Sequence, residues 1–218
     1  MANAHEPILL GRRRTPLYTI VSVLYALIAK LVFRMRFEGL EHIPTEGPVL
    51  LMANHQSFWD PCTLVRCGRG REIHFMGKKE LFAIPVLGAL FRAAHGFPVD
   101  RGGTDMQAMR TGLAILAGGD ILGIFPEGTR AKTAHMLPLH GGASMIAMRS
   151  RCPVVPVYIE GRYRPFARMT VRVGAPIEAD DLYAGRVNRA SCDELTARIE
   201  ARFAQLSGGK SLPPAKDA

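Results

Sequence analysis

The amino-acid sequence predicts an α/β fold in which a central mixed β-sheet is flanked by helices and preceded by a membrane-associated helix. Three observations support this prediction. Short apolar runs, typical of buried strands, alternate along the chain with segments of helical periodicity. Two of these runs end directly in polar turns that carry a histidine or a glutamate. The 218 residues, 48% of them hydrophobic, suffice for one domain with a substantial core.

The charge balance points to an anionic partner. A formal net charge of +9 and an isoelectric point near 9.8 suit nucleic acid, a phospholipid surface or a phosphorylated substrate. The basic residues are scattered and interleave little with aromatic residues, so no nucleic-acid-binding stripe is indicated. A membrane surface or a phosphate is therefore the favoured partner.

The cysteine and histidine patterns indicate neither a metal nor a bound cofactor. The four cysteines form no CxxC pair, and no cluster of histidines, cysteines or carboxylates has metal-ligand spacing. We expect reduced, mostly structural thiols in a cytosol-facing protein.

The start of the chain predicts a basic segment followed by a membrane-directed helix. Residues 1–16 are polar and contain Arg12, Arg13 and Arg14, and an apolar segment over residues 17–34 follows. As a helix this segment reaches roughly 25 Å, somewhat less than a bilayer core of about 30 Å, so spanning is marginal. No A-x-A cleavage site follows, which argues against a signal peptide.

The helical pattern of residues 17–34 favours a helix that lies in the membrane interface. Large apolar side chains share one face, and the flanking Arg34 and Arg36 would bind anionic headgroups. A helix that packs on the protein core is the third interpretation, because periodicity does not distinguish a core from lipid. The apolar face consists of Leu17, Ile20, Val21, Leu24, Ile28, Leu31 and Val32, and the opposite face of Thr15, Thr19, Ser22, Ala26 and Ala29 or Lys30.

Residues 35–206 predict the main domain, and residues 207–218 a flexible tail. Pro85 should split one helix, and capping boxes that begin at Thr104 and Ser191 should start two others. Strands are expected at 48–53, 73–76, 96–101, 121–125, 154–159 and 169–173, and helices at 77–91, 104–117, 141–150 and 191–206.

The polar stretch that follows residues 48–53 is where we expect chemistry. Four residues separate His55 from Asp60, so a turn and the first turn of a helix can fold the carboxylate back onto the imidazole. Such a carboxylate holds one ring nitrogen protonated and leaves the other free to accept a proton, as a general base requires. His95 and Asp100 have the same spacing, so spacing alone does not choose between the two pairs.

Four blocks of sequence, taken in order, resemble the glycerolipid acyltransferase family typified by 1-acyl-sn-glycerol-3-phosphate acyltransferase (PlsC-like enzymes of the H-x4-D type). The resemblance covers roughly residues 36–175, and it identifies His55 and Asp60 as the catalytic pair. The blocks are Asn54-His55-Gln56-Ser57-Phe58-Trp59-Asp60, Gly96-Phe97-Pro98-Val99-Asp100-Arg101, Phe125-Pro126-Glu127-Gly128-Thr129-Arg130 and Val155-Pro156-Val157-Tyr158-Ile159.

The resemblance implies transfer of a fatty acyl group from acyl-CoA or acyl-ACP to the sn-2 hydroxyl of lysophosphatidate, which gives phosphatidate in phospholipid biosynthesis. A thioester is already activated, so a base on the hydroxyl and correct placement of both substrates suffice. No enzyme nucleophile is required, in agreement with the absence of a G-x-S-x-G elbow from the sequence. Another lysolipid or a glycolipid is the alternative acceptor.

The acceptor of the family carries a phosphate, so the resemblance implies cations close to the base. Arg101 and Arg130 match family positions associated with that phosphate, and guanidinium groups suit phosphate oxygens bidentately. Lys78 and Lys79 are secondary candidates, because the family often has a lysine pair at this place.

The third and fourth blocks supply the remaining candidates for substrate binding. Glu127 matches the family glutamate that helps to hold the glycerol, and Gly128 would let the backbone approach the ligand closely. Thr129 lies between these residues and the candidate arginine of the same block. The fourth block implies an apolar wall for the acyl chain, although a core strand describes it equally well. Its candidate residues are Val155, Val157 and Ile159.

The expected partners are a lysophospholipid acceptor, acyl-CoA or acyl carrier protein, and an anionic membrane surface, with no nucleic acid. Access to the thioester places the site on the cytoplasmic face of the cell membrane, and the protein is expected to be peripheral or held by a single span. A non-catalytic lipid-binding protein is the alternative of another class, and it leaves the two polar turns unexplained. The acceptor headgroup, acyl-chain length, donor and oligomeric state stay open.

Overall fold

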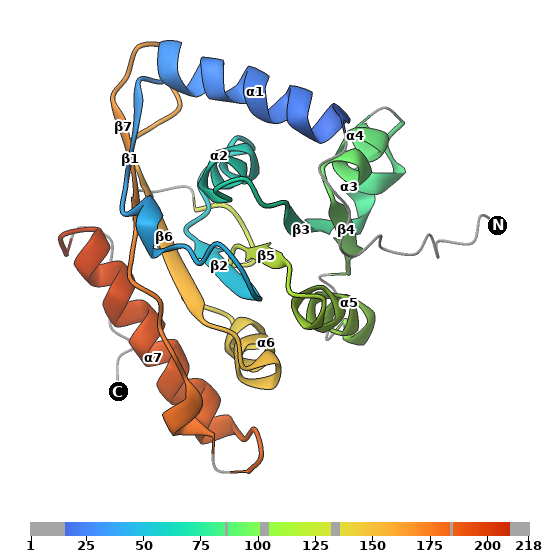
Figure 1. Cartoon of the computed structure of the whole chain (residues 1–218), viewed down its shortest axis with the longest axis vertical. Coiled ribbons are helices and arrows are strands. Elements are labelled where there is room, and N and C mark those ends of the chain that lie inside the picture. Colours follow the sequence, from blue (N-terminus) through green and yellow to red (C-terminus); the bar gives the residue numbers. More distant parts are fainter. Residues whose placement is uncertain (1–15, 86, 101–104, 132–135, 184, 210–218) are drawn as a thin grey trace.

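A computed structural model describes residues 16–85, 87–100, 105–131, 136–183 and 185–209. These residues form a seven-stranded sheet with the strand order β1-β7-β6-β2-β5-β3-β4 (Figure 1). The strands are β1 (Met35–Glu38), β2 (Val49–Ala53), β3 (Ile73–Lys78), β4 (Gly96–Val99), β5 (Ile121–Ile124), β6 (Val154–Glu160) and β7 (Met169–Val173).

The sheet is mixed, as the sequence predicts. The five neighbouring strands β6, β2, β5, β3 and β4 run parallel, whereas β7 pairs antiparallel with β6, and β1 runs parallel with β7. After β2 the chain builds the sheet toward β3 and β4, and it later returns to add β6 on the other side of β2. In open α/β sheets, ligands bind outside the carboxyl ends of the strands at such a reversal.

Helices cover both faces of the sheet, with α1 and α2 on one face and α5, α6 and α7 on the other (Figure 1). Leu50 and Met52 of β2 pack in the core on the α5–α7 side, whereas Val49 and Leu51 pack against α2. Because both faces of β2 are buried, every position of this strand is apolar. The α-helices are α1 (Pro16–Leu31), α2 (Asp60–Cys67), α3 (Lys79–Ala83), α4 (Leu87–Ala93), α5 (Met106–Ala117), α6 (Gly141–Ser150) and α7 (Arg189–Leu206), and the 3-10 helices are η1 (Leu40–His42) and η2 (Asp180–Leu182).

The start of α7 differs from the expected one. The helix begins at Arg189, and Asn188 is its N-cap. The side chain of Asn188 accepts the backbone N–H of Ser191 at 2.9 Å, and the Ser191 hydroxyl accepts the backbone N–H of Asn188 at 3.3 Å. Ser191 therefore closes a capping box and does not begin one, since the asparagine three residues earlier already occupies the N-cap.

Two further expectations concern breaks and starts of helices. Pro85 lies between α3 and α4, so the predicted split of this helix is confirmed. Asp105 is the N-cap of α5, whereas Thr104, the residue expected to cap it, lies outside the described residues.

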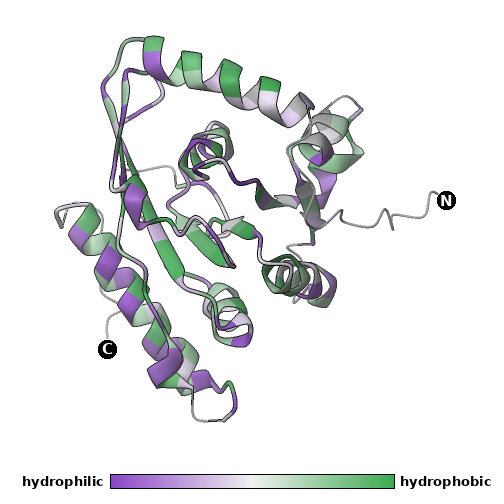
Figure 2. Ribbon diagram, viewed as in Figure 1, coloured by the Kyte–Doolittle hydropathy of each residue, from purple (hydrophilic) through white to green (hydrophobic). Residues whose placement is uncertain are grey.

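The N-terminal helix α1 turns one face toward the protein and exposes the other. In the part of the chain that the structure describes, no helix combines the length and the apolar character that crossing a bilayer requires. Figure 2 shows hydrophobic residues along most of α1. The buried face, which lies against α2 and β1, consists of Tyr18, Ser22, Tyr25 and Ala29. The exposed face consists of Ile20, Val23, Leu24, Leu27 and Leu31, each more than half exposed. Core packing therefore applies to the tyrosine face, and the aliphatic face points away from the protein.

Candidate active site

The segment after β2 is held in place by a side chain that imitates a strand. The Asn54 amide donates to the carbonyl of Ile159 at 3.1 Å and accepts the backbone N–H of Ile159 at 2.7 Å. These two bonds extend the pairing of β2 with β6 past the last residue of β2. His55 consequently begins a loop at the carboxyl edge of the parallel strands.

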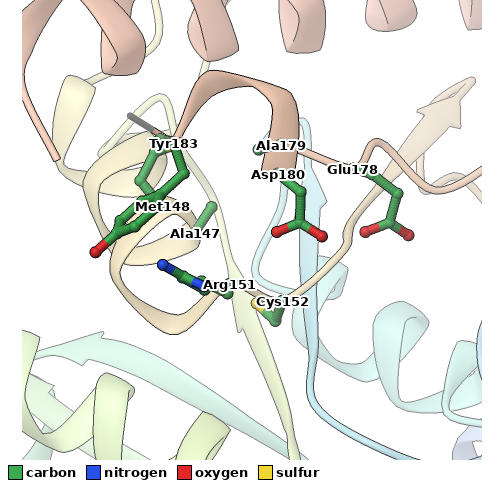
Figure 3. Close-up of a pocket in the computed structure, with 8 residues that line it drawn as sticks. All are labelled: Ala147, Met148, Arg151, Cys152, Glu178, Ala179, Asp180 and Tyr183. Carbon is green, nitrogen blue, oxygen red and sulfur yellow. The ribbon is translucent and has the colours of Figure 1, made fainter. Parts of the chain in front are cut away.

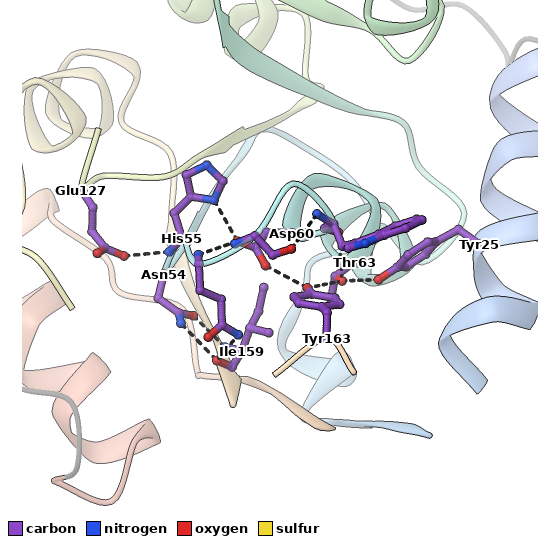
Figure 4. Close-up of polar contacts among 11 residues, drawn as sticks. Tyr25, Asn54, His55, Asp60, Thr63, Glu127, Ile159 and Tyr163 are labelled. Carbon is purple, nitrogen blue, oxygen red and sulfur yellow. Dashed lines mark hydrogen bonds and ion pairs between the residues drawn. The ribbon is translucent and has the colours of Figure 1, made fainter. Parts of the chain in front are cut away.

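His55 and Asp60 form the predicted contact. Nδ1 of His55 lies 2.8 Å from Oδ2 of Asp60 (Figure 4). The same oxygen accepts the backbone N–H groups of Gln56 at 2.6 Å and Ser57 at 2.7 Å. Asp60 is the first residue of α2 and is fully buried, and unpaired N–H groups at a helix start favour a carboxylate there. The backbone thus fixes the carboxylate that orients the imidazole.

The imidazole of His55 is oriented by an aromatic ring on one face and by the carboxylate of Asp60 at Nδ1. Its ring stacks on Phe125, with centroids 4.1 Å apart and an interplanar angle of 20°. The backbone carbonyl of His55 accepts the N–H of Ala131 at 2.8 Å. Because Nδ1 faces a carboxylate, it carries the ring proton, and Nε2 is the accepting nitrogen. Among the described residues Nε2 has no hydrogen-bond partner, so this atom can take a proton from a substrate.

Glu127 joins the two polar loops of the site. Its carboxylate is 1% exposed and accepts the backbone N–H of His55 at 2.7 Å and that of Leu137 at 2.8 Å. Burial raises the pKa of Glu127 to about 7, against the lowering effect of these two hydrogen bonds, and Asp60 raises it further. Both carboxylate oxygens accept backbone N–H groups, so Glu127 positions residues 54–59, which we call the histidine loop. Contact with the glycerol stays a prediction.

Gly128, Thr129 and Arg130 continue this turn toward the surface. Gly128 has a φ of +67°, and a Cβ there would lie 2.8 Å from the ring of His140, so only glycine fits. Thr129 and Arg130 are exposed. The Arg130 guanidinium lies 3.8 Å from the ring centroid of Phe58, which belongs to the histidine loop. The structure therefore brings Arg130 beside the segment that carries His55 and Asp60.

The two candidate lysines lie at the same carboxyl edge, two strands away from β2. Lys78 contacts Glu80 at 3.4 Å and Lys79 pairs with Asp100, and all four side chains are about half exposed. Arg101, the second candidate for the phosphate, lies outside the described residues. Of the predicted cations, only Arg130 contacts a residue of the first block in the described structure.

The candidate apolar wall belongs to the core in this structure. Val155 and Val157 are fully buried among residues that pack against α2, and Ile159 is 1% exposed beside Phe33 and Met169. Core packing alone accounts for their apolar character. Their contact with an acyl chain stays a prediction.

The second histidine pair is separated by the fold. His95 precedes β4 and contacts Glu72 at 3.3 Å, whereas Asp100 follows β4 and pairs with Lys79. The equal spacing of the two pairs therefore gives two different geometries, and a local contact forms only in the pair that contains His55.

Three hydroxyl groups near the carboxylate of Asp60 were not predicted. Tyr163 donates to Oδ1 of Asp60 at 2.8 Å, and Thr63 and Tyr25 follow behind it (Figure 4). Tyr163 lies 103 positions after Asp60. No local motif signals a contact over such a distance, and only the strand order reveals it.

A small pocket lies at the other edge of the sheet. Arg151 stacks on Tyr183 at 3.7 Å, and the carboxylates of Glu178 and Asp180 lie side by side next to them (Figure 3). Cys152 of this pocket precedes β6, so the pocket faces the amino ends of the parallel strands, away from His55. Among the described residues, no group of three or more histidines, cysteines or carboxylates could hold a metal ion.

A histidine held by a carboxylate at the carboxyl ends of parallel strands is an arrangement typical of α/β enzymes. The match of residues 34–160 to the Acyltransferase family model shows the particular family. The chain belongs to the Acyltransferase family and is an acyltransferase.

Similar proteins have been named by their reactions. The chain is 30% identical over 171 residues to 1-acyl-sn-glycerol-3-phosphate acyltransferase of Bacillus subtilis, covering 76% of this chain and 84% of that protein. It is 31% identical over 166 residues to a chloroplastic enzyme of the same name from Brassica napus, covering 74% of this chain and 48% of that protein. The crystal structure of the 1-acyl-sn-glycerophosphate acyltransferase of Thermotoga maritima matches with a TM-score of 0.70 at 23% identity, over 96% of this chain and 86% of that one. This last likeness concerns the fold.

Proposed function

We propose that the protein transfers a fatty acyl group from a thioester, acyl-CoA or acyl-ACP, to the sn-2 hydroxyl of lysophosphatidate, giving phosphatidate. The contact between His55 and the fully buried Asp60 carries this proposal. The names of the relatives in Bacillus subtilis and Brassica napus support the acceptor.

In the proposed reaction His55 is the general base. Nε2 takes the proton of the acceptor hydroxyl as its oxygen attacks the thioester carbonyl, and Asp60 stabilises the imidazolium that forms. The tetrahedral intermediate then expels the thiolate, which takes the proton back from Nε2. An ester bond forms, a thioester bond breaks, and His55 returns to its starting state without an acyl-enzyme intermediate.

Arg130 is proposed to bind the phosphate of the acceptor. Stacking on Phe58 covers one face of the guanidinium and leaves the N–H groups at its edge available for phosphate oxygens. Lys78 and Lys79 already contact carboxylates, so they are weaker candidates. A role for Arg101 remains part of the proposal without a described position.

We also propose that α1 lies in the membrane interface on the cytoplasmic face of the cell membrane, where thioester donors are available. The exposed aliphatic face of α1 supports this placement. Phe166, 72% exposed, lies in the loop that follows β6, and its backbone N–H donates to the carbonyl of Val32 just after α1. Exposed arginines, including Arg34 and Arg164, flank this region and suit anionic headgroups.

The first test measures thiol release from a long-chain acyl-CoA by the detergent-purified protein, with and without lysophosphatidate. Release should require the acceptor and should fall by about 10²- to 10⁴-fold in His55→Ala. His42→Ala is the matched control, because His42 bonds to the carbonyl of Val173 far from the site. Release without acceptor would contradict the proposal and indicate a thioesterase. A higher rate with another lysolipid or a glycolipid would replace the acceptor, and parallel assays with acyl-ACP identify the donor.

A further inference from the structure

A chain of hydrogen-bonded hydroxyl groups leads from α1 to the catalytic carboxylate (Figure 4). Tyr163 lies 2.8 Å from Oδ1 of Asp60, Thr63 Oγ1 lies 2.8 Å from the Tyr163 oxygen, and Tyr25 of α1 lies 2.5 Å from Thr63 Oγ1. We propose that Tyr163 is a positioning residue for the catalytic pair, and that Thr63 and Tyr25 couple the placement of α1 to it. We call Tyr25, Thr63 and Tyr163 the hydroxyl chain.

The hydrogen bonds of the hydroxyl chain have one consistent direction. An ionised carboxylate only accepts, so the Tyr163 proton belongs to Asp60. Tyr163 can then only accept from Thr63, at 2.8 Å, although the carbonyl of Trp59 lies 3.2 Å from the same Thr63 hydroxyl and competes for its proton. When Thr63 donates to Tyr163 it can only accept from Tyr25, whose longer contact with the sulfur of Met35 is 3.8 Å. In this arrangement every hydroxyl donates toward Asp60, and such an aligned series strengthens each of its members.

Burial keeps the two phenols in the form that donates. Thr63 and Asp60 are 0% exposed and Tyr25 is 3% exposed. Burial raises the pKa of Tyr163 and of Tyr25 well above the ordinary value of a phenol, so both retain their protons at neutral pH.

The two oxygens of Asp60 have different partners, and this division explains why Tyr163 matters. Oδ2 accepts His55 Nδ1 and the backbone N–H groups of Gln56 and Ser57. Among the described residues, Tyr163 is the donor to Oδ1. The phenol therefore fixes the rotation of the carboxylate about its Cβ–Cγ bond, and with it the direction in which Oδ2 meets the imidazole.

Aromatic packing holds the hydroxyl chain against α1. Trp59, next to Asp60 in the sequence, stacks on Tyr25 with centroids 5.8 Å apart and an interplanar angle of 24°. Phe33, just after α1, meets the ring of Tyr163 edge-on at 5.3 Å. Tyr25 belongs to α1 and Phe33 follows its last residue closely, so a displacement of this helix moves both side chains. The opposite face of α1 is exposed and aliphatic, so a membrane surface that binds it can displace the helix. The orientation of the catalytic carboxylate thus depends on how α1 is seated.

The test uses single-hydroxyl deletions and rests on the acyl transfer proposed above. Tyr163→Phe keeps the ring and should lower kcat by about 10- to 100-fold, the range for a hydrogen bond to a charged group, with little change in KM for either substrate. Thr63→Val should have a smaller effect and Tyr25→Phe the smallest, in the same direction. Tyr183→Phe is the matched control, because Tyr183 stacks on Arg151 at the other edge of the sheet.

Two readouts separate positioning from a purely structural role. The 1H resonance of the His55 Nδ1 proton, identified by its loss in His55→Ala, should move in Tyr163→Phe and stay in place in Tyr183→Phe. In a His55→Ala background, Tyr163→Phe should cause no further loss of the residual rate, because the two residues act as one unit.

The possible outcomes distinguish the two proposals. If the wild type shows no acceptor-dependent release, the proposed function fails, and the Nδ1 resonance still tests the hydroxyl chain. If the wild type is active and Tyr163→Phe keeps its kcat and its Nδ1 resonance, the positioning role is overturned. If Tyr163→Phe does not fold, a wild-type kcat in Thr63→Val overturns the role. An effect of Tyr163→Phe and Thr63→Val without any effect of Tyr25→Phe would end the hydroxyl chain at Thr63 and overturn the coupling to α1.

Discussion

Histidines and carboxylates meet at both edges of the parallel strands, but the histidine rings of the two groups pack against different neighbours. At the carboxyl edge, a fully buried Asp60 holds Nδ1 of a partly exposed His55 at 2.8 Å. At the amino edge, His74 lies 3.6 Å from Asp120 and His95 lies 3.3 Å from Glu72, and the two rings meet edge-on with centroids 5.2 Å apart. Similar side chains thus give one histidine stacked on Phe125 beside a backbone-held carboxylate at one edge, and two histidines packed against each other at the other edge.

The largest effect on activity is expected when the histidine at the carboxyl edge is replaced, and a small effect when a histidine at the amino edge is replaced. His55→Ala should lower kcat/KM by about 10²- to 10⁴-fold, the usual contribution of a general base. His95→Asn should keep most of the activity, and asparagine also tolerates the φ of +60° at this position. Equal losses in both variants, measured as acceptor-dependent thiol release, would contradict the assignment of the site.

The second prediction compares the substitution of Asp60 at the carboxyl edge with that of Asp120 at the amino edge. Asp60→Asn replaces one accepting oxygen by an amide N–H₂ group that opposes the N–H donors of Gln56 and Ser57, so kcat should fall by about 10²- to 10⁴-fold. Asp120→Asn at the amino edge should affect stability more than kcat. The assay is steady-state kinetics together with the midpoint of thermal unfolding, and an active Asp60→Asn protein would argue against an orienting role.

Arg130 tests whether the carboxyl edge binds the phosphate. Arg130→Ala should raise KM for lysophosphatidate by about 10- to 100-fold, because a charge-assisted contact is lost, and Arg130→Lys should recover only part of it. Arg189→Ala is the matched control, since Arg189 is exposed at the start of α7 and pairs with Asp193. A KM that stays at the wild-type value in Arg130→Ala would exclude this arginine as the phosphate ligand.

The two edges should also differ in the pH dependence of stability. Burial raises the pKa of Glu127 from 4.5 to about 7, so the stabilisation by its protonated form is complete below pH 4.5 and is lost as the pH rises through about 7. Burial, with the nearby His95, lowers the pKa of His74 below 6.5, so its stabilisation is complete above pH 6.5 and is lost as the pH falls. Ionisation of Glu127 over the pH range from 4.5 to about 7 should lower the free energy of unfolding by about 3 kcal/mol.

Chemical unfolding between pH 4 and 8 checks these opposite signs. The stability of Glu127→Gln relative to the wild type should rise with increasing pH, and that of His74→Gln should rise with decreasing pH. Slopes of the same sign in the two variants would refute the assigned causes.

Features encoded within a few neighbouring residues could be predicted from the sequence. The apolar run of β2, the spacing of His55 and Asp60, and the break at Pro85 are all local, and the structure contains each of them. The strand β1 was missed because its four residues alternate between half-buried and exposed and gain their pairing only from β7. Periodicity also suggested one lipid-facing side of α1, but it could not reveal that the other side buries Tyr25 against α2.

In the candidate site, too, the features encoded by neighbouring residues could be predicted, and the contacts between distant segments could not. Arg130 follows a strand end and was predictable, whereas its stacking on Phe58 joins two separate loops. Tyr163 was missed because its partner lies 103 positions earlier and no spacing rule connects them. Glu127 was recognised as important, but its position between two backbone N–H groups follows from the path of the loops.

The backbone N–H groups of Gln56 and Ser57 allow the contact between the loop and Asp60 to be followed by hydrogen exchange without substrate. Both lie in a loop, where amide hydrogens normally exchange with solvent within moments, yet both donate to a carboxylate that water does not reach. Their deuterium uptake therefore measures how often the loop detaches from Asp60. Slower uptake on vesicles than in detergent would mean that a bilayer tightens the catalytic pair before any substrate arrives.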